Sequence, residues 1–172
     1  DYGKMAPAAE PLTKLMGEAH DVRIIGKDTD LTLKTIGGGQ SKPCTGKLNI
    51  PDGEVFTAPI LDSVNGKILY GPSNYEGQSF KSIALEFKDG VVVSAIADGG
   101  DPERTAALNK ILDTDPGARR IGEFAIAFNA MILHPVGDIL FDEKINGSLH
   151  FALGQCYENH APNGNTSAIH WD

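Results

Sequence analysis

The chain has 172 residues, of which 41% are hydrophobic and 22% are charged, a balance typical of one compact folded domain. Its 15 basic and 23 acidic side chains give a net charge of −8, which disfavours a nucleic-acid surface or a polybasic membrane patch. No apolar run approaches the roughly 20 residues of a membrane span. Two cysteines, Cys44 and Cys156, are too few for a disulfide framework, so we expect two free buried thiols.

The first half of the chain is typical of one short helix followed by strands. Pro11 suits the first position of a helix over residues 11–19. The pair Asn65-Gly66 predicts a hairpin turn. The strands predicted from apolar patterning and turn residues cover residues 22–25, 30–36, 54–60 and 67–70.

The second half combines a hairpin with two helices and two final strands. Asp89-Gly90 forms the hairpin turn, and Asp115 with Pro116 is typical of an N-cap and the first position of a helix. Because strands precede and follow the helices, we predict an α+β fold with a mixed, mostly antiparallel sheet and a few packed helices. The predicted strands cover 82–87, 91–97, 147–154 and 167–172, and the predicted helices cover 102–112 and 115–129.

Glu123 is the only ionisable side chain between Ile121 and Leu133, inside a predicted helix that is apolar on almost every face. A buried carboxylate needs a cation, a metal or several hydrogen-bond donors. Glu123 is therefore a metal ligand, an ion-pair partner of Arg119 or Arg120, or an exposed residue at the start of the helix.

Three further polar side chains lie at strand positions that suit a ligand. His150 shares a strand face with small residues, which leaves space for a ligand, although a hydrogen-bonded structural histidine fits equally well. His170 and Asp172 are two residues apart, so a strand places both on one face. They suit a metal pair, a base with its orienting carboxylate, or an ordinary polar pair at a strand end.

Glu54 and Tyr157 complete a set of nitrogen and oxygen donors, although alone they would be an exposed carboxylate and a packed ring. The six residues contain no thiolate and suit Zn²⁺, Co²⁺ or Mn²⁺, in a number sufficient for two ions. The sequence has no Gly-x-Ser-x-Gly, Walker or His-Glu-x-x-His motif, which disfavours a hydrolase elbow, a nucleotide site and an ordinary zincin.

Five segments, taken together and in order, resemble the thermophilic metallo-aminopeptidases, the family of aminopeptidases T and S. They are residues 49–59 (NIPDGEVFTAP), 62–66 (DSVNG), 112–123 (LDTDPGARRIGE), 139–145 (ILFDEKI) and 167–172 (SAIHWD). The resemblance implies that residues 1–172 are the metal-binding catalytic domain of a longer cytoplasmic aminopeptidase. It also implies a homodimeric parent protein with a further N-terminal domain, and no leader peptide is expected.

The resemblance implies a ligand set and a reaction. Two divalent ions (Zn²⁺, Co²⁺, Mn²⁺ or Mg²⁺) would activate a water molecule that releases the N-terminal residue of a peptide substrate. Glu123 would bridge the ions and accept the proton of the water; Glu143 is the alternative acceptor, unless it only pairs with Lys144 or another cation. The family's ligands match Glu54, Glu123, His150, Tyr157, His170 and Asp172.

Two other functions stay open from the sequence. The chain is either a metal-free or inactive module that needs the missing N-terminal domain for assembly and activity, or a two-metal site acting on a phosphoester or another amide. Metal binding and a substrate panel separate these possibilities from peptide hydrolysis.

Overall fold

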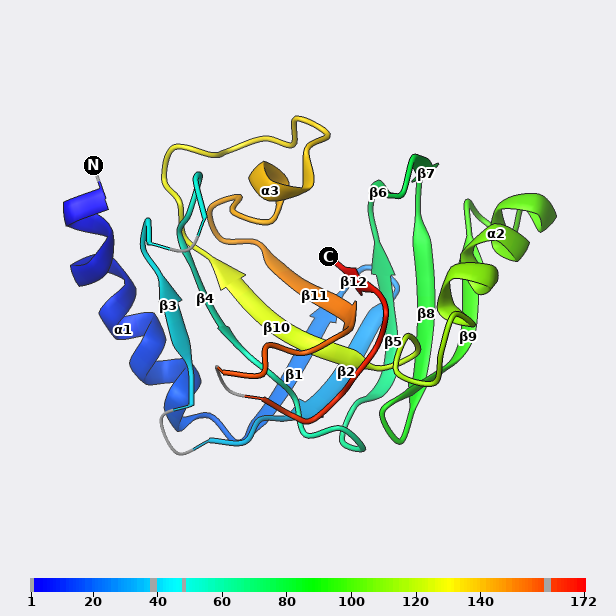
Figure 1. Cartoon of the computed structure of the whole chain (residues 1–172), viewed down its shortest axis with the longest axis horizontal. Coiled ribbons are helices and arrows are strands. Elements are labelled where there is room, and N and C mark those ends of the chain that lie inside the picture. The colour runs from blue at the N-terminus through cyan, green and yellow to red at the C-terminus, as the bar shows by residue number, and fades with distance from the viewer. Residues whose placement is uncertain (1, 38–39, 48, 160–161) are drawn as a thin grey trace.

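Two five-stranded sheets form the framework of the protein (Figure 1). The structure is a computed structural model, and it describes residues 2–37, 40–47, 49–159 and 162–172. Every pairing between neighbouring strands of these sheets is antiparallel. Together with the helices described below, this confirms the predicted α+β class.

The first sheet has the strand order β1-β2-β5-β8-β9. Its strands are Asp21–Gly26, Thr29–Lys34, Asn65–Tyr70, Ile83–Lys88 and Val91–Ala97. Asp89 and Gly90 both have positive φ and join β8 to β9, as a tight hairpin of this twist requires. The predicted hairpin is therefore confirmed.

The second sheet has the order β12-β11-β10-β4-β3 and carries the candidate site. In that order its strands are His170–Trp171, Leu149–Gly154, Ile121–Ala127, Glu54–Thr57 and Lys42–Cys44. A separate two-stranded ribbon, β6 (Ser73–Tyr75) and β7 (Gln78–Phe80), stands beside the C-terminal strand (Figure 1). The final strand is shorter than the predicted 167–172.

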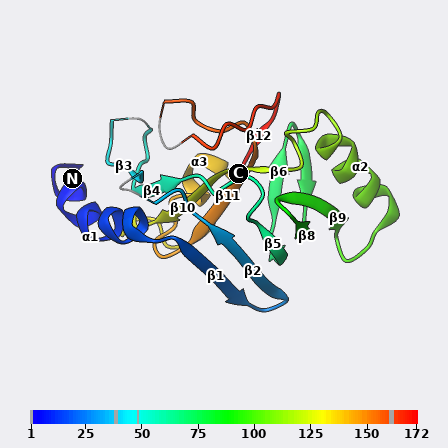
Figure 2. The ribbon, with the colours of Figure 1, turned by 90° about the horizontal axis from the view of Figure 1, so that it is seen from below.

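Two of the three α-helices in the described ranges lie at opposite ends of the molecule, as the view from below also shows (Figure 2). Helix α1 (Met5–Glu18), which follows the 3-10 turn η1 (Tyr2–Lys4), packs on β3 and β4. Helix α2 (Pro102–Leu112) packs on β9. The short helix α3 (Ile139–Asp142) lies in the connection between β10 and β11. None of the helices in the described ranges is long and apolar enough to span a bilayer.

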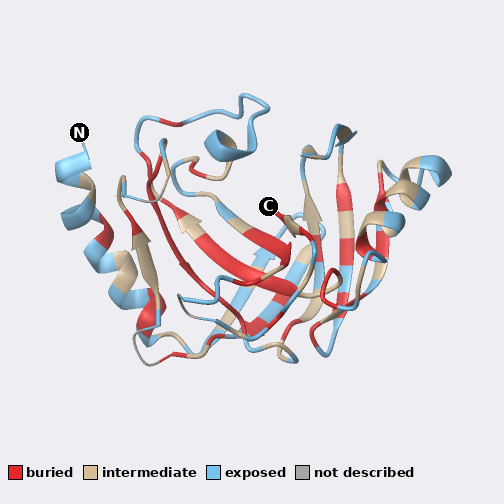
Figure 3. Ribbon diagram, in the orientation of Figure 1, coloured by how far each residue is buried: buried red, intermediate tan, exposed pale blue. Residues whose placement is uncertain are grey.

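The main hydrophobic core is built from both sheets. The first sheet contributes Leu31, Leu85 and Phe87, and the second contributes Phe124 and Phe151. Buried residues follow β10 and β4 through the centre of the molecule, whereas the outer sides of the helices are exposed (Figure 3). One face of the second sheet is therefore committed to the core, which leaves its other face available for polar chemistry.

The predicted helix over residues 115–129 is wrong. Asp115 instead accepts hydrogen bonds from the backbone N–H groups of Gly117 and Ala118 within a turn. The following apolar residues form the central strand β10. Such a strand is buried on both faces, and its sequence is then a continuous apolar run that periodicity cannot distinguish from a buried helix.

Two boundaries in the first half also differ from the prediction. Helix α1 begins at Met5 and contains Pro11 in its interior; Pro7 and Pro11 are exposed, so the carbonyl left without an N–H partner can face water. A helix over residues 11–19 is predicted to place Leu12, Leu15 and Met16 on one apolar face, but Leu15 is 66% exposed. Asn65-Gly66 does not form a hairpin turn but begins β5, where Gly66 has positive φ and passes directly beside the backbone of Asp30.

Candidate metal centre

Strand register places four of the predicted ligands on one face of the second sheet. Residues directly opposite each other on antiparallel strands share a face. Glu54 is opposite Ala127, and Glu123 is opposite Ala152. His150 is opposite Ala125, and His170 is opposite Gly154. The positions opposite these four on β10 and β11 are thus alanine or glycine, which leaves room for the polar side chains above the sheet.

A β-bulge at Gly122 allows Glu123 to join that face. The register of β10 against β11 shifts between Ile121 and Glu123, so Ile121 pairs with Leu153 on the core side while Glu123 pairs with Ala152. A bulge inserts one residue and reverses the alternation of side chains. A Cβ at Gly122 would lie 2.4 Å from the carbonyl oxygen of Gly154, so the bulge requires glycine.

The polar side chains form two groups of three ligand atoms that share Glu123. In the first, His150 Nε2 lies 3.4 Å from Glu54 Oε2 and 3.8 Å from Glu123 Oε1. In the second, His170 Nε2 lies 3.5 Å from Glu123 Oε2 and 3.6 Å from Asp172 Oδ2. Within each group the chosen ligand atoms all lie within 4.8 Å of one another. Glu123 thus presents one oxygen to each group.

These separations fit donor atoms that surround an ion better than they fit hydrogen bonds. Hydrogen bonds of this kind are about 2.7–3.2 Å long. Tetrahedral coordination with bonds of about 2.0–2.2 Å separates two donors by roughly 3.3–3.6 Å. Consistently, the buried His170 Nε2 and Asp172 Oδ1 have no hydrogen-bond partner within the described ranges. The residues present therefore fit divalent metal ions.

The second ring nitrogen of His170 has a partner that orients the imidazole. Its Nδ1 lies 2.7 Å from the carbonyl oxygen of Gln155 and, as the N–H tautomer, donates to it. A metal-binding histidine commonly donates its other ring N–H to a carbonyl or carboxylate, which fixes the tautomer. In the neutral ring, Nε2 is then the nitrogen with a free lone pair on the side of the carboxylates.

A buried lysine compensates part of the negative charge. Lys144 is 1% exposed; its Nζ lies 2.8 Å from Glu54 Oε2 and also contacts Glu143. Glu143 in turn groups with His150 and Asp172. The cluster contains four carboxylates, Glu54, Glu123, Glu143 and Asp172, and Lys144 pairs with two of them, so the cluster retains capacity for further positive charge.

The cluster shifts the pKa values of its members in opposite directions. Burial raises the pKa of Glu54, Glu143 and Asp172. Burial acts in the same direction on Glu123, but His150 and His170 outweigh it and hold the pKa of Glu123 at about 2. The same contact with Glu123 raises the pKa of His170 to about 9. Without metal ions, protons on the imidazoles balance the shared carboxylate.

Tyr157 lies at the edge of the cluster and is the most exposed predicted ligand, at 43%. Its ring packs edge-on against His170, with the ring centroids 5.3 Å apart, and also contacts Phe56. The structure thus brings the other five predicted ligands together and places Tyr157 beside His170. Burial raises the pKa of its phenol, so the hydroxyl is protonated in the metal-free chain.

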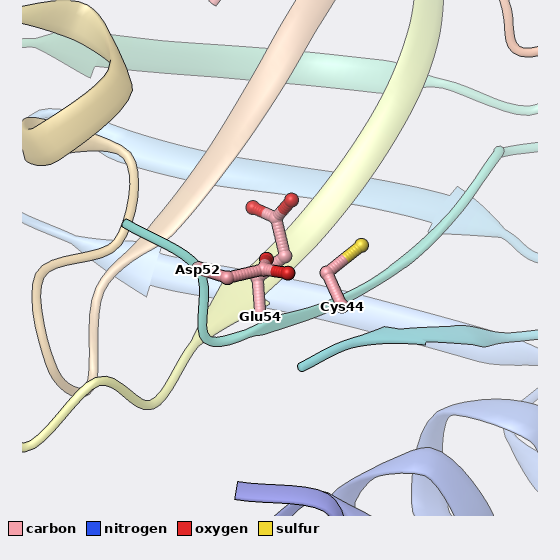
Figure 4. A group of neighbouring side chains, drawn as sticks. All are labelled: Cys44, Asp52 and Glu54. Carbon is pink, nitrogen blue, oxygen red and sulfur yellow. The ribbon is translucent and has the colours of Figure 1, made fainter. Parts of the chain in front are cut away.

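Cys44, Asp52 and Glu54 form a further group that sequence reasoning did not assemble (Figure 4). The carboxylate of Asp52 already accepts backbone N–H groups of Gly46 and Gly53, so it anchors its own loop. Burial and the carboxylate of Glu54 raise the pKa of the Cys44 thiol. The thiol is therefore neutral, and both Cys44 and Cys156 are free and buried, as predicted.

Lys144 is the residue of the site whose role the sequence did not predict. It was named only as a possible partner of Glu143, not as a buried cation beside Glu54. The segment 139–145 was noted as a motif, but nothing in its spacing shows that Lys144 reaches Glu54 on β4. Lys144 follows Asp142 and Glu143 in the sequence, so it looks like part of an ordinary charged segment, and its contact with the distant Glu54 leaves no local signal.

A comparison with protein-family models matches residues 5–172 to the thermophilic metalloprotease (M29) family. The chain belongs to this family. Aminopeptidase 2 of Geobacillus stearothermophilus is 40% identical over 124 residues, and aminopeptidase T of Thermus aquaticus is 34% identical over 177 aligned positions. These alignments cover 67% and 89% of this chain.

Solved structures agree with the M29 assignment. Wild-type AmpT from Thermus thermophilus superposes with a TM-score of 0.75 at 28% identity, over 99% of this chain and 46% of that one. A 2,5-dihydroxypyridine dioxygenase from Pseudomonas putida KT2440 shares the fold alone, at 18% identity and a TM-score of 0.61. This M29 chain spans 28% and 42% of the two curated relatives, less than half of each.

Proposed function

We propose that the chain is the metal-binding catalytic domain of a metal-dependent aminopeptidase that holds two divalent ions. One observation carries the proposal: two groups of buried donors share Glu123, and their spacing of 3.4–3.8 Å suits coordination rather than hydrogen bonding. The M29 family match and relatives named as aminopeptidases support the choice of reaction.

In this proposal Glu123 would contribute to holding both ions, with Glu54 and His150 as further ligands in one group and His170 and Asp172 in the other. Tyr157 joins the second group from beside His170. When bound, such ions lower the pKa of a water molecule and polarise a carbonyl group. Lys144 favours the ionised form of Glu54 against the effect of burial, which raises the pKa of Glu54, and the Gln155 carbonyl orients the ring of His170.

Glu143 is the better acceptor for the proton of the attacking water. Both oxygens of Glu123 face imidazoles and its pKa is lowered, so it is a weak base and is committed as a ligand. Burial raises the pKa of Glu143, which also stands within the group of His150 and Asp172. A raised pKa is what a carboxylate that exchanges protons near neutral pH requires.

Metal stoichiometry tests the proposal directly. Elemental analysis of the purified chain should find about two ions per chain after loading with Zn²⁺ or Co²⁺. EDTA should remove these ions and lower the melting temperature of the chain. His150→Ala and His170→Ala should each retain about one ion, whereas Glu123→Gln should weaken both sites. His134→Ala, an exposed histidine outside the cluster, is the control.

Hydrolysis of leucine p-nitroanilide by the loaded chain then separates the alternatives. Metal binding with hydrolysis supports a self-sufficient catalytic domain. Metal binding without hydrolysis of this anilide or of peptides supports a module that needs further domains, or a different amide or phosphoester substrate. Absence of metal binding in excess Zn²⁺ and Co²⁺ would overturn the two-metal proposal.

A further inference from the structure

Two segments that carry different parts of the candidate metal centre meet at the carboxylate of Asp115. Its Oδ1 accepts the backbone N–H groups of Gly117 and Ala118, in the turn before β10. Its Oδ2 accepts the Ser167 hydroxyl at 3.0 Å and the Ala168 N–H at 2.7 Å, although these residues lie 52 and 53 positions further along the chain. One side chain therefore joins the approach to β12 to the turn that leads into β10.

The two segments are closely packed as well as hydrogen-bonded. A Cβ built on Gly117 would lie 1.9 Å from the carbonyl oxygen of Thr166, so only glycine allows the backbones to approach this closely. The buried Asn165 adds a second tie, because its Nδ2 donates to the carbonyl oxygens of Gly117 and Gly154. The loop before β12 is thus fixed on the turn from more than one point.

A continuous series of hydrogen bonds leads from Asp115 to His170. The Ser167 hydroxyl donates to Asp115 and accepts the backbone N–H of Ile169 at 3.2 Å. The carbonyl oxygen of Ile169 accepts the N–H of Gln155 at 2.7 Å, and the carbonyl oxygen of Gln155 accepts Nδ1–H of His170. The side chain of Gln155 also accepts the N–H of Ser167 at 2.9 Å. The series ends on the imidazole whose Nε2 faces two carboxylates of the cluster.

We propose that Asp115 is a positioning residue of the metal centre, which holds Ser167 and Ala168 so that the imidazole of His170 faces its candidate ion. Asp115 belongs to no group of candidate ligand atoms within the described ranges, so its influence on an ion passes through residues 167–170. Removing a group that orients a metal-binding histidine commonly weakens metal binding about 10- to 100-fold. The inference rests on the proposed two-ion centre for its functional meaning, but the hydrogen bonds belong to the metal-free chain.

Four substitutions separate positioning from general stability. Asp115→Ala removes all four hydrogen bonds, whereas Ser167→Ala removes only the link towards β12 and leaves the turn before β10 intact. Ser167→Thr keeps the hydroxyl and should behave like the original chain. The control is Asp30→Ala on the first sheet, which removes a carboxylate that accepts two hydrogen bonds from Arg23. Melting temperatures establish which variants fold.

The first measurement uses the metal-free chain. The Nδ1–H proton of His170, observed by NMR with ¹⁵N-labelled histidine and identified by its loss in His170→Gln, reports on the hydrogen bond to Gln155. Asp115→Ala and Ser167→Ala should each raise its exchange rate with water about 5- to 10-fold, as the loss of one hydrogen bond allows. Ser167→Thr and Asp30→Ala should leave the rate unchanged.

The second measurement is the Zn²⁺ affinity of chains that keep one group of ligands. His150→Ala leaves the group that contains His170, and His170→Ala leaves the group that contains His150. Adding Asp115→Ala should weaken Zn²⁺ binding about 10-fold or more in the first background and leave it unchanged in the second. Asp30→Ala should change the affinity in neither background. Calorimetric titration measures all of these affinities.

The outcomes separate this inference from the two-ion proposal. If Asp115→Ala moves neither the His170 signal nor the Zn²⁺ affinity more than Asp30→Ala does, or if it weakens both backgrounds equally, Asp115 only stabilises the fold and the inference is overturned. If Asp115→Ala does not fold, Ser167→Ala is judged by the same criteria against Ser167→Thr. If the His170 signal responds but even the original chain binds no Zn²⁺, the two-ion proposal fails while the positioning of His170 is supported.

Discussion

Glu123 and Lys144 show how single residues set the charge of this site. Glu123 lies on the central strand and divides its two oxygens between His150 and His170. Lys144 contributes the ammonium group that faces Glu54 and Glu143. Each is almost fully buried, and each depends on charged or titratable partners: Glu123 on histidines of β11 and β12, and Lys144 on Glu54 of β4 and on its chain neighbour Glu143. Removing one partner leaves the others as buried charges without compensation.

Replacing Lys144 with methionine tests this dependence. We expect Lys144→Met to lower the free energy of unfolding of the metal-free chain by about 3–5 kcal/mol, because Glu54 and Glu143 lose their shared cation. Added Zn²⁺ should recover part of the loss. Urea unfolding measures both effects, with Lys88→Met as an exposed control. An equal, small effect of both variants would contradict the role given to Lys144.

The metal-free chain should lose stability between about pH 6.5 and pH 9. Glu123 and Asp172 face His170, and Glu123 raises the pKa of His170 from 6.5 to about 9. A raised histidine pKa stabilises the folded state fully below the unfolded pKa, and that contribution is lost as the pH rises through the folded pKa.

Urea midpoints measured across this pH range provide the check. The slope should weaken in His170→Gln and in the Zn²⁺-loaded chain, where the imidazole is not protonated. A slope that is identical in all three samples would contradict the prediction.

At the scale of elements, strand β10 is the feature on which the site depends most. It lies between β11 and β4, and its bulge at Gly122 brings Glu123 to the polar face while Ile121 stays in the core. The adjoining turn is held by Asp115, whose carboxylate also accepts the backbone N–H of Ala168 at 2.7 Å. The same turn therefore ties the approach to β12 to the start of β10.

Gly122→Ala should damage both stability and metal binding. The added Cβ would lie 2.4 Å and 2.6 Å from the carbonyl oxygens of Gly154 and Gln155, so one strand must move. We expect a loss of about 1–3 kcal/mol in the free energy of unfolding, together with weaker Zn²⁺ binding. Gly26→Ala, where the new atom meets only Thr29 Cβ at 3.7 Å, should change neither quantity measurably.

At the scale of the whole molecule, Trp171 joins the second sheet to the β6–β7 ribbon. This residue belongs to the second sheet, and its ring stacks on Tyr75 and packs on Phe80 of the β6–β7 ribbon. Its N–H donates to Ser73 on the same ribbon. Candidate ligands lie immediately before and after it in the chain. The packing of the ribbon against Trp171 therefore helps to position the candidate ligands His170 and Asp172.

Trp171→Phe should weaken the His170–Asp172 side of the centre selectively. The smaller ring loses the hydrogen bond to Ser73 and part of its packing, and we expect the free energy of unfolding to fall by about 2–4 kcal/mol. Zn²⁺ titration by calorimetry should show one weakened and one retained site. Ser73→Ala removes only the acceptor and should cause a smaller loss of about 1 kcal/mol. Equal weakening of both sites would contradict this arrangement.

The sequence singled out side chains that the structure brings together, but it did not predict every element that carries them. Strand patterning correctly placed His150 beside small residues and His170 on the side of Asp172. The predicted helix around Glu123 is wrong, because a strand buried on both faces has no alternation to reveal it. Convergence was not predictable from spacing, since β4, β10 and β11 meet only through non-local pairing.

The position of Trp171 has a thermodynamic consequence for any ligand of this domain. Trp171 lines an apolar pocket of about 190 Å³, and its chain neighbours are candidate metal ligands, so a molecule in the pocket and a metal ion would both act on one three-residue segment. Linkage requires that a pocket occupant change the affinity for the ion by the same factor as the ion changes the affinity for the occupant. We therefore expect a metal titration in the presence of an occupant that packs on Trp171 to give a different affinity from a titration without it.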